Sequence, residues 1–206
     1  MASPRISAVI FDIGNVLFRW HPRFLYERLI ADPAALDAFV RDVVNEEWHF
    51  QHDAGRPFAE TSAERIAQFP EHADLIAAWG PRFNESLPGP VDGMVEIVEQ
   101  LDAAQVPLFA ITNFSAEFWP PFRATQAALF DRFRDIVVSG EERLVKPDPA
   151  IYRLALARFG LRAEEAMFID DNPANVAAAA ALGIHAIRFE AAAGVRAELR
   201  RLGLLG

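Results

Sequence analysis

The sequence predicts an α/β fold, in which helices cover both faces of a parallel sheet and a helical segment is inserted after the first strand. From residue 91 onward, short apolar runs rich in β-branched residues alternate with helical stretches, a pattern typical of βαβ units. A similar apolar run, residues 6–11, lies near the N-terminus and ends in Asp-Ile-Gly-Asn. Residues 19–87 instead contain successive helical stretches and no strand signal.

The first strand is expected at residues 6–11, because a short apolar run bounded by turn residues is typical of a buried strand. In the inserted segment, glycine and proline separate the helical stretches, and Asp32, Asn45 and Thr61 are candidate caps or first-turn residues. The expected helices of this segment are residues 22–30, 33–44, 45–53, 58–69 and 71–79.

A Leu-Pro-Gly-Pro linker at residues 87–90 separates the helical segment from the alternating part of the chain. We therefore expect one unit made of residues 1–18 and 88–206, and an inserted unit made of residues 19–87. Beyond the linker, the expected helices are residues 91–104, 116–130, 149–159, 173–182 and 191–202, and the expected strands are residues 106–112, 136–139, 166–170 and 184–189.

Composition excludes several classes of protein. The chain has 206 residues, 52% of them hydrophobic and 24% charged, as in soluble globular proteins. A net charge of −9 and a pI near 5.0 argue against nucleic-acid binding and against docking to an anionic membrane. Without cysteine, the chain has no disulfide, thiolate zinc site or cysteine nucleophile. No apolar run is long enough for a membrane span or a signal-peptide core, so we expect a cytoplasmic protein.

Lys146 is the only lysine among 20 basic residues. It lies in the string Leu-Val-Lys-Pro-Asp-Pro, where the prolines restrict the backbone. A solvated loop lysine is the simple interpretation. A compact point charge in a restricted loop also suits an oxyanion that forms during a reaction.

Polar residues follow three of the expected strands, and ligands of parallel sheets bind at the carboxyl ends of strands. Asp12 follows the first strand, Thr112-Asn113 ends another, and Asp170-Asp171 ends a third. Taken singly, such residues are usually turn residues or helix caps. Adjacent carboxylates, however, repel each other unless a cation compensates, and Mg²⁺ prefers oxygen ligands. The group therefore indicates a site for a phosphoryl group and a metal ion.

The order Asp, Thr, Lys, Asp-Asp along the strand ends resembles that of the haloacid dehalogenase (HAD) superfamily of hydrolases. The resemblance covers the whole chain and implies a Rossmann-like core with a helical C1-type cap at residues 19–87. Within the superfamily, Phe-Asp-Ile-Gly-Asn-Val-Leu is most similar to bacterial phosphatases of the α-glucose-1-phosphatase kind. The residues that match the four motifs of the superfamily are Asp12, Thr112-Asn113, Lys146, and Asp170-Asp171 with Asn175.

The resemblance implies a Mg²⁺-dependent phosphomonoesterase that acts on a small phosphorylated metabolite, with a sugar phosphate as one candidate. Asp12 would attack phosphorus to form an aspartyl-phosphate. Thr112, Asn113 and Lys146 would hold the phosphoryl oxygens. The residues that would bind or orient Mg²⁺ and its waters are Asp12, the Gly14 carbonyl, Asp170, Asp171 and Asn175.

One position departs from most phosphatases of the superfamily. They carry a second aspartate two residues after the nucleophile, which acts as general acid and base, whereas this chain has Gly14. Glycine has no proton to give. The candidates that could replace it are His49, His52, a metal-bound water and the substrate itself.

The cap is expected to select the substrate, and the candidate substrate contacts in or near it are Arg19, Trp20 and His52. Arg19 is expected near the cleft because it lies seven positions after Asp12. The simple alternative is that the aromatic residues of the cap, including Trp48 and Phe50, form the core of a small helical bundle.

Two alternative functions stay open at this point. A metal-free 2-haloacid dehalogenase would use Asp12 to attack carbon and would need Arg19 or Arg23 for the substrate carboxylate, although the paired Asp170-Asp171 argues against it. A slow phosphate-binding or phospho-accepting regulator would suit the glycine at position 14. For all three functions the expected partner is a small molecule, with the protein a monomer or a homodimer.

Overall fold

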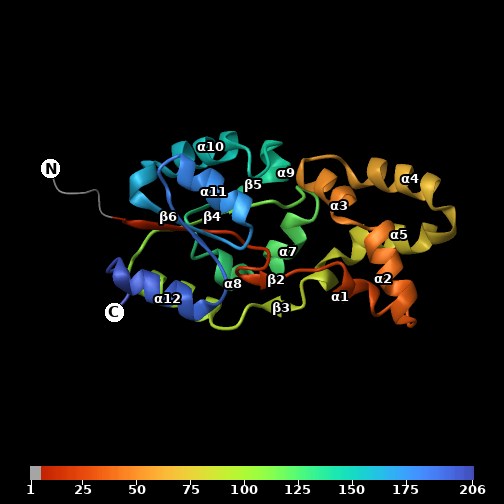
Figure 1. Cartoon of the computed structure of the whole chain (residues 1–206), viewed down its shortest axis with the longest axis horizontal. Coiled ribbons are helices and arrows are strands. Elements are labelled where there is room, and N and C mark those ends of the chain that lie inside the picture. The colour runs from red at the N-terminus through yellow and green to blue at the C-terminus, as the bar shows by residue number, and fades with distance from the viewer. Residues whose placement is uncertain (1–5) are drawn as a thin grey trace.

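A five-stranded parallel sheet forms the centre of the molecule (Figure 1), as the sequence predicts. The structure is a computed structural model, and it describes residues 6–206. The strands lie in the order β5-β4-β1-β6-β7, so that β1 is central. They are β1 (Ala8–Phe11), β4 (Leu108–Thr112), β5 (Asp135–Val138), β6 (Ala166–Asp170) and β7 (His185–Arg188).

The sequence of β1 shows why the sheet is buried on both sides. All four of its residues are inaccessible to solvent. Val9 and Phe11 belong to one hydrophobic cluster, whereas Ala8 and Ile10 belong to a second. Since successive side chains of a strand point to opposite faces, the two clusters lie on opposite faces of the sheet.

Helices cover each face. Helices α10 and α11 supply apolar side chains of the cluster that holds Ala8 and Ile10, and helices α6, α7, α8 and α12 supply side chains of the cluster of Val9 and Phe11 on the opposite face. Figure 1 shows α10 and α11 on one side of the strands and α8 and α12 on the other. The helices are α6 (Met94–Ala103), α7 (Trp119–Thr125), α8 (Ala127–Phe130), α10 (Pro149–Phe159), α11 (Pro173–Ala181) and α12 (Ala192–Arg201).

The helical segment between β1 and α6 lies at one end of the molecule, on the right of Figure 1. Two short strands, β2 (Phe18–Arg19) and β3 (Gly89–Pro90), pair antiparallel where this segment begins and ends. The division into a cap of residues 19–87 and a core of residues 1–18 and 88–206 stays our proposal. The helices of the segment are α1 (Arg23–Tyr26), α2 (Pro33–Asp42), α3 (Glu46–Asp53), α4 (Phe58–Gln68) and α5 (Ala73–Arg82), with 3₁₀ turns at Pro70–His72 and Phe83–Ser86.

Aromatic side chains form the interior of this segment. Tyr26 and Trp79 are inaccessible to solvent and stack with 5.9 Å between their ring centres. Trp48, which the sequence left open between core and site, is 2% exposed and donates from its indole N–H to the carbonyl of Thr61. Two of the expected caps are present, since Asp32 accepts from the Ala35 amide and Asn45 from the Trp48 amide. Thr61 does not cap a helix, because it lies inside α4, whose N-cap is Pro57.

Some element boundaries differ from those that the sequence predicts. The helix expected at residues 22–30 is helical only over Arg23–Tyr26 and continues as turns. The strand expected from residue 106 begins at Leu108, after a proline that lacks an amide donor. The 87–90 linker contains β3, and an unpredicted turn of helix, α9 (Ser139–Glu142), follows β5. No helix among residues 6–206 has the length and apolar character that crossing a bilayer requires.

Candidate active site

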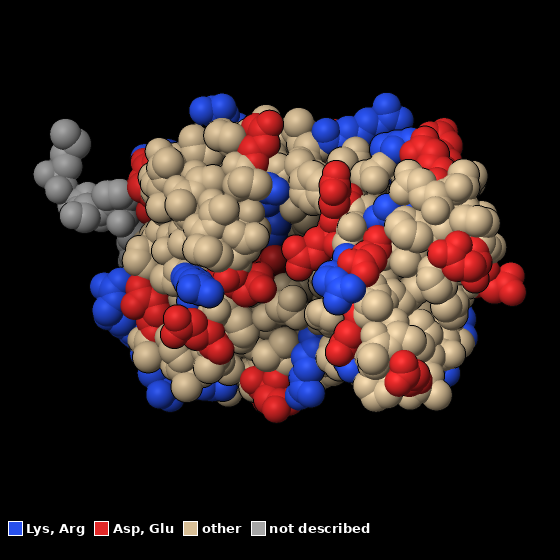
Figure 2. Space-filling model, turned by 45° about the vertical axis from the view of Figure 1, so that its right-hand side comes forward, with Lys and Arg blue, Asp and Glu red and all other residues tan. Residues whose placement is uncertain are grey.

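The site lies at the carboxyl ends of the central strands. Asp12 follows β1 and Asp170 ends β6, and the parallel register brings them together because Phe11 pairs with Ile169. A cavity of about 270 Å³ opens at this edge of the sheet, and Figure 2 shows the surface hollowed between the two ends of the molecule, with acidic side chains beside the hollow. The residues that line the cavity include Asp12, Gly14, Trp20, Glu46, His49, Phe50, Asp53, Phe83, Asn113, Lys146, Asp171 and Asn175.

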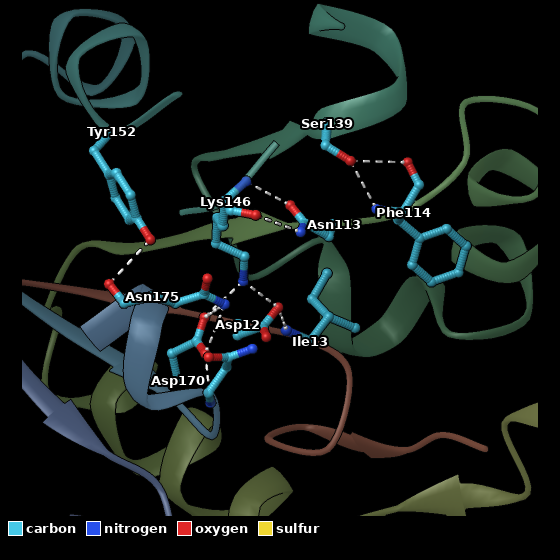
Figure 3. Close-up of polar contacts among 10 residues, drawn as sticks. Asp12, Ile13, Asn113, Phe114, Ser139, Lys146, Tyr152, Asp170 and Asn175 are labelled. Atoms are coloured by element: carbon cyan, nitrogen blue, oxygen red, sulfur yellow. Dashed lines mark hydrogen bonds and ion pairs between the residues drawn. The ribbon is translucent and has the colours of Figure 1, made fainter. Parts of the chain in front are cut away.

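Lys146 joins the two buried carboxylates (Figure 3). Its Nζ lies 2.8 Å from Asp12 Oδ1 and 2.7 Å from Asp170 Oδ2, and its side chain is 1% exposed. Burial by itself lowers the pKa of an ammonium group, but the two carboxylates outweigh burial and raise the pKa of Lys146 above its usual value. Lys146 therefore holds a permanent positive charge beside Asp12.

The backbone of Lys146 is fixed by a side chain from the neighbouring strand end. The amide of Lys146 donates to Asn113 Oδ1 at 2.8 Å, and Asn113 Nδ2 donates to the carbonyl of Lys146 at 3.0 Å (Figure 3). This pair of hydrogen bonds joins the end of β4 to the loop before α10. The sequence predicts Asn113 as a phosphoryl contact, and in the structure its side chain positions Lys146.

Asp12 has the environment of a reactive carboxylate. Its Oδ1 accepts from Lys146 and from the Ile13 amide at 2.7 Å, whereas Oδ2 accepts no hydrogen bond from residues 6–206. Burial raises the pKa of Asp12 to about 7, with Lys146 acting to lower it and the Asp170 carboxylate acting to raise it. A cation next to Oδ2 would favour the ionised form.

The two adjacent aspartates have different surroundings. Asp170 is inaccessible to solvent, and its oxygens accept from Lys146, from Asn175 Nδ2 at 3.0 and 3.1 Å, and from the Asn172 amide at 2.8 Å. Asp171 is half-buried and lines the cavity. Burial raises the pKa of Asp171, and the charge of Asp170 raises it further. The oxygens of Asp170 are therefore used in contacts with neighbouring residues, whereas Asp171 is accessible to a ligand in the cavity.

The donor set fits a magnesium ion. One carboxylate oxygen from each of Asp12, Asp170 and Asp171 lies within 4.8 Å of the others. Three carboxylates face the single cation Lys146, and an all-oxygen set of this kind suits Mg²⁺. Gly14 also lines the cavity.

Thr112 ends β4 and is 1% exposed, and its Oγ1 has no hydrogen-bond partner among the described residues. A buried hydroxyl without a partner is costly, so an acceptor brought by a ligand would satisfy it. Trp20 reaches the cavity and stacks on His49 with 4.6 Å between ring centres.

Two expected substrate contacts lie elsewhere. Arg19 does not line the cavity, contrary to expectation, because its Nη2 pairs with Asp92 at 2.8 Å and its side chain is 54% exposed. In β2 the side chains alternate, so that Phe18 points inward and Arg19 outward. His52 also does not line the cavity; it is 1% exposed and its Nε2 lies 2.7 Å from Thr61 Oγ1.

Asp53 lines the cavity although no motif in the sequence indicated it. This buried aspartate ends α3, lines the cavity with Asp12, and lies four residues after His49. The signal available in the sequence was this spacing, because residues four apart share one face of a helix.

Comparisons with known proteins identify the family of this chain. The family model of haloacid dehalogenase-like hydrolases matches residues 6–183. The sesquiterpene phosphatase astK of Aspergillus oryzae is 28% identical over 197 residues, which cover 95% of this chain and 96% of that protein.

Solved structures share the fold. A HAD-like family hydrolase from Porphyromonas gingivalis superimposes with a TM-score of 0.72 at 22% identity, covering 98% of both chains. A HAD family enzyme from Bacteroides thetaiotaomicron, solved with magnesium and inorganic phosphate, gives 0.68 at 19% identity over 90% of this chain and 95% of that one. The L-2-haloacid dehalogenase of Xanthobacter autotrophicus gives 0.64 at 20% identity over 95% and 83%. This chain belongs to the haloacid dehalogenase-like hydrolases, a family of enzymes.

Proposed function

We propose that the protein is a Mg²⁺-dependent phosphomonoesterase that works through an aspartyl-phosphate. The observation that carries the proposal is the buried Lys146 between Asp12 and Asp170, at a cavity that Asp171 also lines. This arrangement combines a carboxylate nucleophile with a fixed cation for a phosphoryl group. The similarity to a sesquiterpene phosphatase over nearly the whole of both chains supports the same reaction.

In the proposed reaction, Oδ2 of Asp12 attacks phosphorus in line with the leaving oxygen. Lys146 holds Asp12 by its other oxygen and faces the phosphoryl group with its remaining positive charge. The Thr112 hydroxyl and the Asn113 backbone amide hold phosphoryl oxygens. Water then hydrolyses the aspartyl-phosphate and restores Asp12.

The proposed magnesium ligands are Asp12, Asp171 and the carbonyl of Gly14, all of which line the cavity. Asp170, with Asn175 hydrogen-bonded to it, orients Lys146 and would orient the waters of a bound ion. When bound, Mg²⁺ offsets the repulsion between the Asp12 carboxylate and the phosphate. A solved structure of the same fold contains magnesium and inorganic phosphate, which supports the choice of magnesium as the ion.

The proposed substrate is a small phosphorylated metabolite. The aromatic side chains of Trp20, Phe50 and Phe83 line the cavity, which suits a substrate with a sugar ring or another apolar group. A sugar phosphate therefore stays among the candidate substrates. The proposal includes a cytoplasmic location, a monomer or homodimer, and no nucleic-acid or membrane partner.

The two alternative functions make different predictions about the site and its reaction. A 2-haloacid dehalogenase needs an arginine for the substrate carboxylate, but no arginine among residues 6–206 lines the cavity. A phospho-accepting regulator would keep a stable aspartyl-phosphate and show no steady-state turnover.

A panel of phosphate esters and 2-chloro acids, each assayed with Mg²⁺ and with EDTA, tests the proposal. We expect phosphate release that requires Mg²⁺ and that disappears in Asp12→Asn. Halide release in EDTA would indicate the dehalogenase, and labelling by acetyl phosphate without turnover would indicate the regulator.

A further inference from the structure

The site as described lacks a proton donor for the leaving oxygen. Gly14 occupies the position of the usual acid, and a Cβ built there meets no atom within 4 Å. The alkoxide of an unactivated ester is a poor leaving group, so its departure needs a proton. A donor must therefore reach the cavity from another element.

Asp53 is a carboxyl group in the wall of that cavity. It is 6% exposed, and its Oδ1 is buried with no hydrogen-bond partner among residues 6–206. His49 Nε2 lies 3.6 Å from Oδ2, beyond hydrogen-bond distance. A buried carboxylate without a partner is costly, whereas a carboxylic acid that donates to a ligand is not.

Burial and the charge of Asp12 favour the protonated form of Asp53. Burial raises the pKa of Asp53 well above its usual value, the Asp12 carboxylate raises it further, and Lys146 opposes both. Burial lowers the pKa of His49 to about 3, and the neighbouring His52 lowers it further. Since His49 is neutral, it has no imidazolium proton to give and does not ion-pair with Asp53.

The position of Asp53 is fixed to the sheet. Ser139, at the carboxyl end of β5, donates from Oγ to the backbone carbonyl of Asp53 at 2.6 Å and accepts from the Phe114 amide at 2.9 Å. Just beyond α3, a Cβ on Gly55 would lie 2.9 Å from the carbonyl oxygen of Gly140. The absence of a side chain at Gly55 therefore lets the end of α3 approach α9 closely, and together with the Ser139 hydrogen bond this holds Asp53 over the strand ends.

We propose that Asp53 is the general acid and base of this enzyme, in place of the residue missing at position 14; this inference rests on the proposed phosphatase function. As Asp12 bonds to phosphorus, the bond from phosphorus to the leaving oxygen breaks, and that oxygen takes its electron pair and the proton of Asp53. The Asp53 carboxylate then takes a proton from the water that attacks the aspartyl-phosphate, which releases phosphate and restores both residues.

The test compares two esters that differ in their need for a proton. Dinitrophenyl phosphate has a leaving group that departs as the anion, whereas an alkyl phosphate such as glycerol phosphate requires protonation. For Asp53→Asn we expect kcat/KM for the alkyl ester to fall by about 10²–10⁴-fold and that for the dinitrophenyl ester to fall by less than about tenfold. The ratio of the two values does not depend on the fraction of folded enzyme.

Hydrolysis of the intermediate provides a second readout. Asp53→Asn should release a burst of dinitrophenol, because the aspartyl-phosphate then forms faster than it breaks down. Glu46→Gln is the matched control, since Glu46 lines the same cavity from the same helix but is exposed. Any loss in this control should be equal for the two esters.

An unchanged ratio in Asp53→Asn would overturn the inference while leaving the phosphatase function intact, and so would a selective loss in Glu46→Gln. If the unaltered enzyme with Mg²⁺ hydrolysed neither ester, the proposed function would itself be wrong, and the inference would fall with it.

Discussion

Removal of the buried ammonium group should destabilise the protein strongly. In the unaltered protein, Lys146 Nζ lies 2.8 Å from Asp12 and 2.7 Å from Asp170. Lys146→Met keeps the length of the side chain but leaves these two buried carboxylates without their shared cation. Loss of one partner from a buried ion pair costs about 3–5 kcal/mol. For a domain of this size that corresponds to a fall in Tm of roughly 6–20 °C.

The measurement is urea or thermal unfolding in EDTA at pH 8, which is above the Asp12 pKa of about 7. The loss should be smaller at pH 5, because Asp12 is then protonated in the folded protein and no longer repels the Asp170 carboxylate as an ion. The double variant Lys146→Met/Asp170→Asn should recover part of the loss. As a control, Arg82→Met breaks an ion pair with Glu85 at the surface and should cost less than about 1 kcal/mol.

A loss below about 1 kcal/mol for Lys146→Met, or no recovery in the double variant, would refute this account of the ion pairs. Lys146→Arg separates charge from geometry. Arginine keeps the charge but is longer and planar. It would have to fit a buried site in which the ammonium group of Lys146 lies 5.6 Å from the centre of the Phe168 ring. Turnover should therefore fall by about 10²-fold or more in a folded protein.

Three further predictions concern the same strand ends. In EDTA the free energy of unfolding should fall by up to about 4 kcal/mol as pH rises from 4 to 8. The reason is that folding raises the Asp12 pKa from 3.8 to about 7, so the stability that protonated Asp12 contributes at low pH is lost through that range. A pH profile equally steep in Asp12→Asn would contradict this. Saturating Mg²⁺ should raise Tm, because binding at a Mg²⁺ concentration of 100 times Kd stabilises the folded protein by about 2.7 kcal/mol. Asp171→Asn should abolish most of that rise in Tm, and an equal rise in the variant would place the ion elsewhere. Gly14→Ala should leave the denaturation midpoint unchanged or raise stability by up to about 1 kcal/mol, because the position has space and lacks a left-handed backbone; a clear loss would show hidden strain.

The core of the site could be predicted from the sequence because parallel strands end at one edge. The strand Ala166–Asp170 and the helix Pro149–Phe159 have the bounds that the sequence predicts. Asp12 and Asp170 follow buried apolar runs, so the sequence places both at one edge of the sheet. Their contact through Lys146 also requires that β1 and β6 pair side by side, which the sequence did not predict. The single lysine, Lys146, lies between them as its unusual occurrence indicated.

The contribution of the helical segment could not be predicted in the same way. Its helices were recognisable, but the face that each one turns to the strand ends depends on packing between distant elements. His49 and Asp53 reach the cavity, whereas His52 faces Thr61 of the next helix. Arg19 failed as a prediction because proximity in the chain does not fix the direction of a side chain in a short strand.

The central claim is that Asp12 is the nucleophile. Its most direct test is rapid acid quenching of the enzyme during turnover of dinitrophenyl phosphate with Mg²⁺, followed by mass spectrometry of the peptides. We predict a phosphoryl group on Asp12, accumulating further in Asp53→Asn. A phosphoryl group on another residue, or turnover by Asp12→Asn at the rate of the unaltered enzyme, would contradict the account.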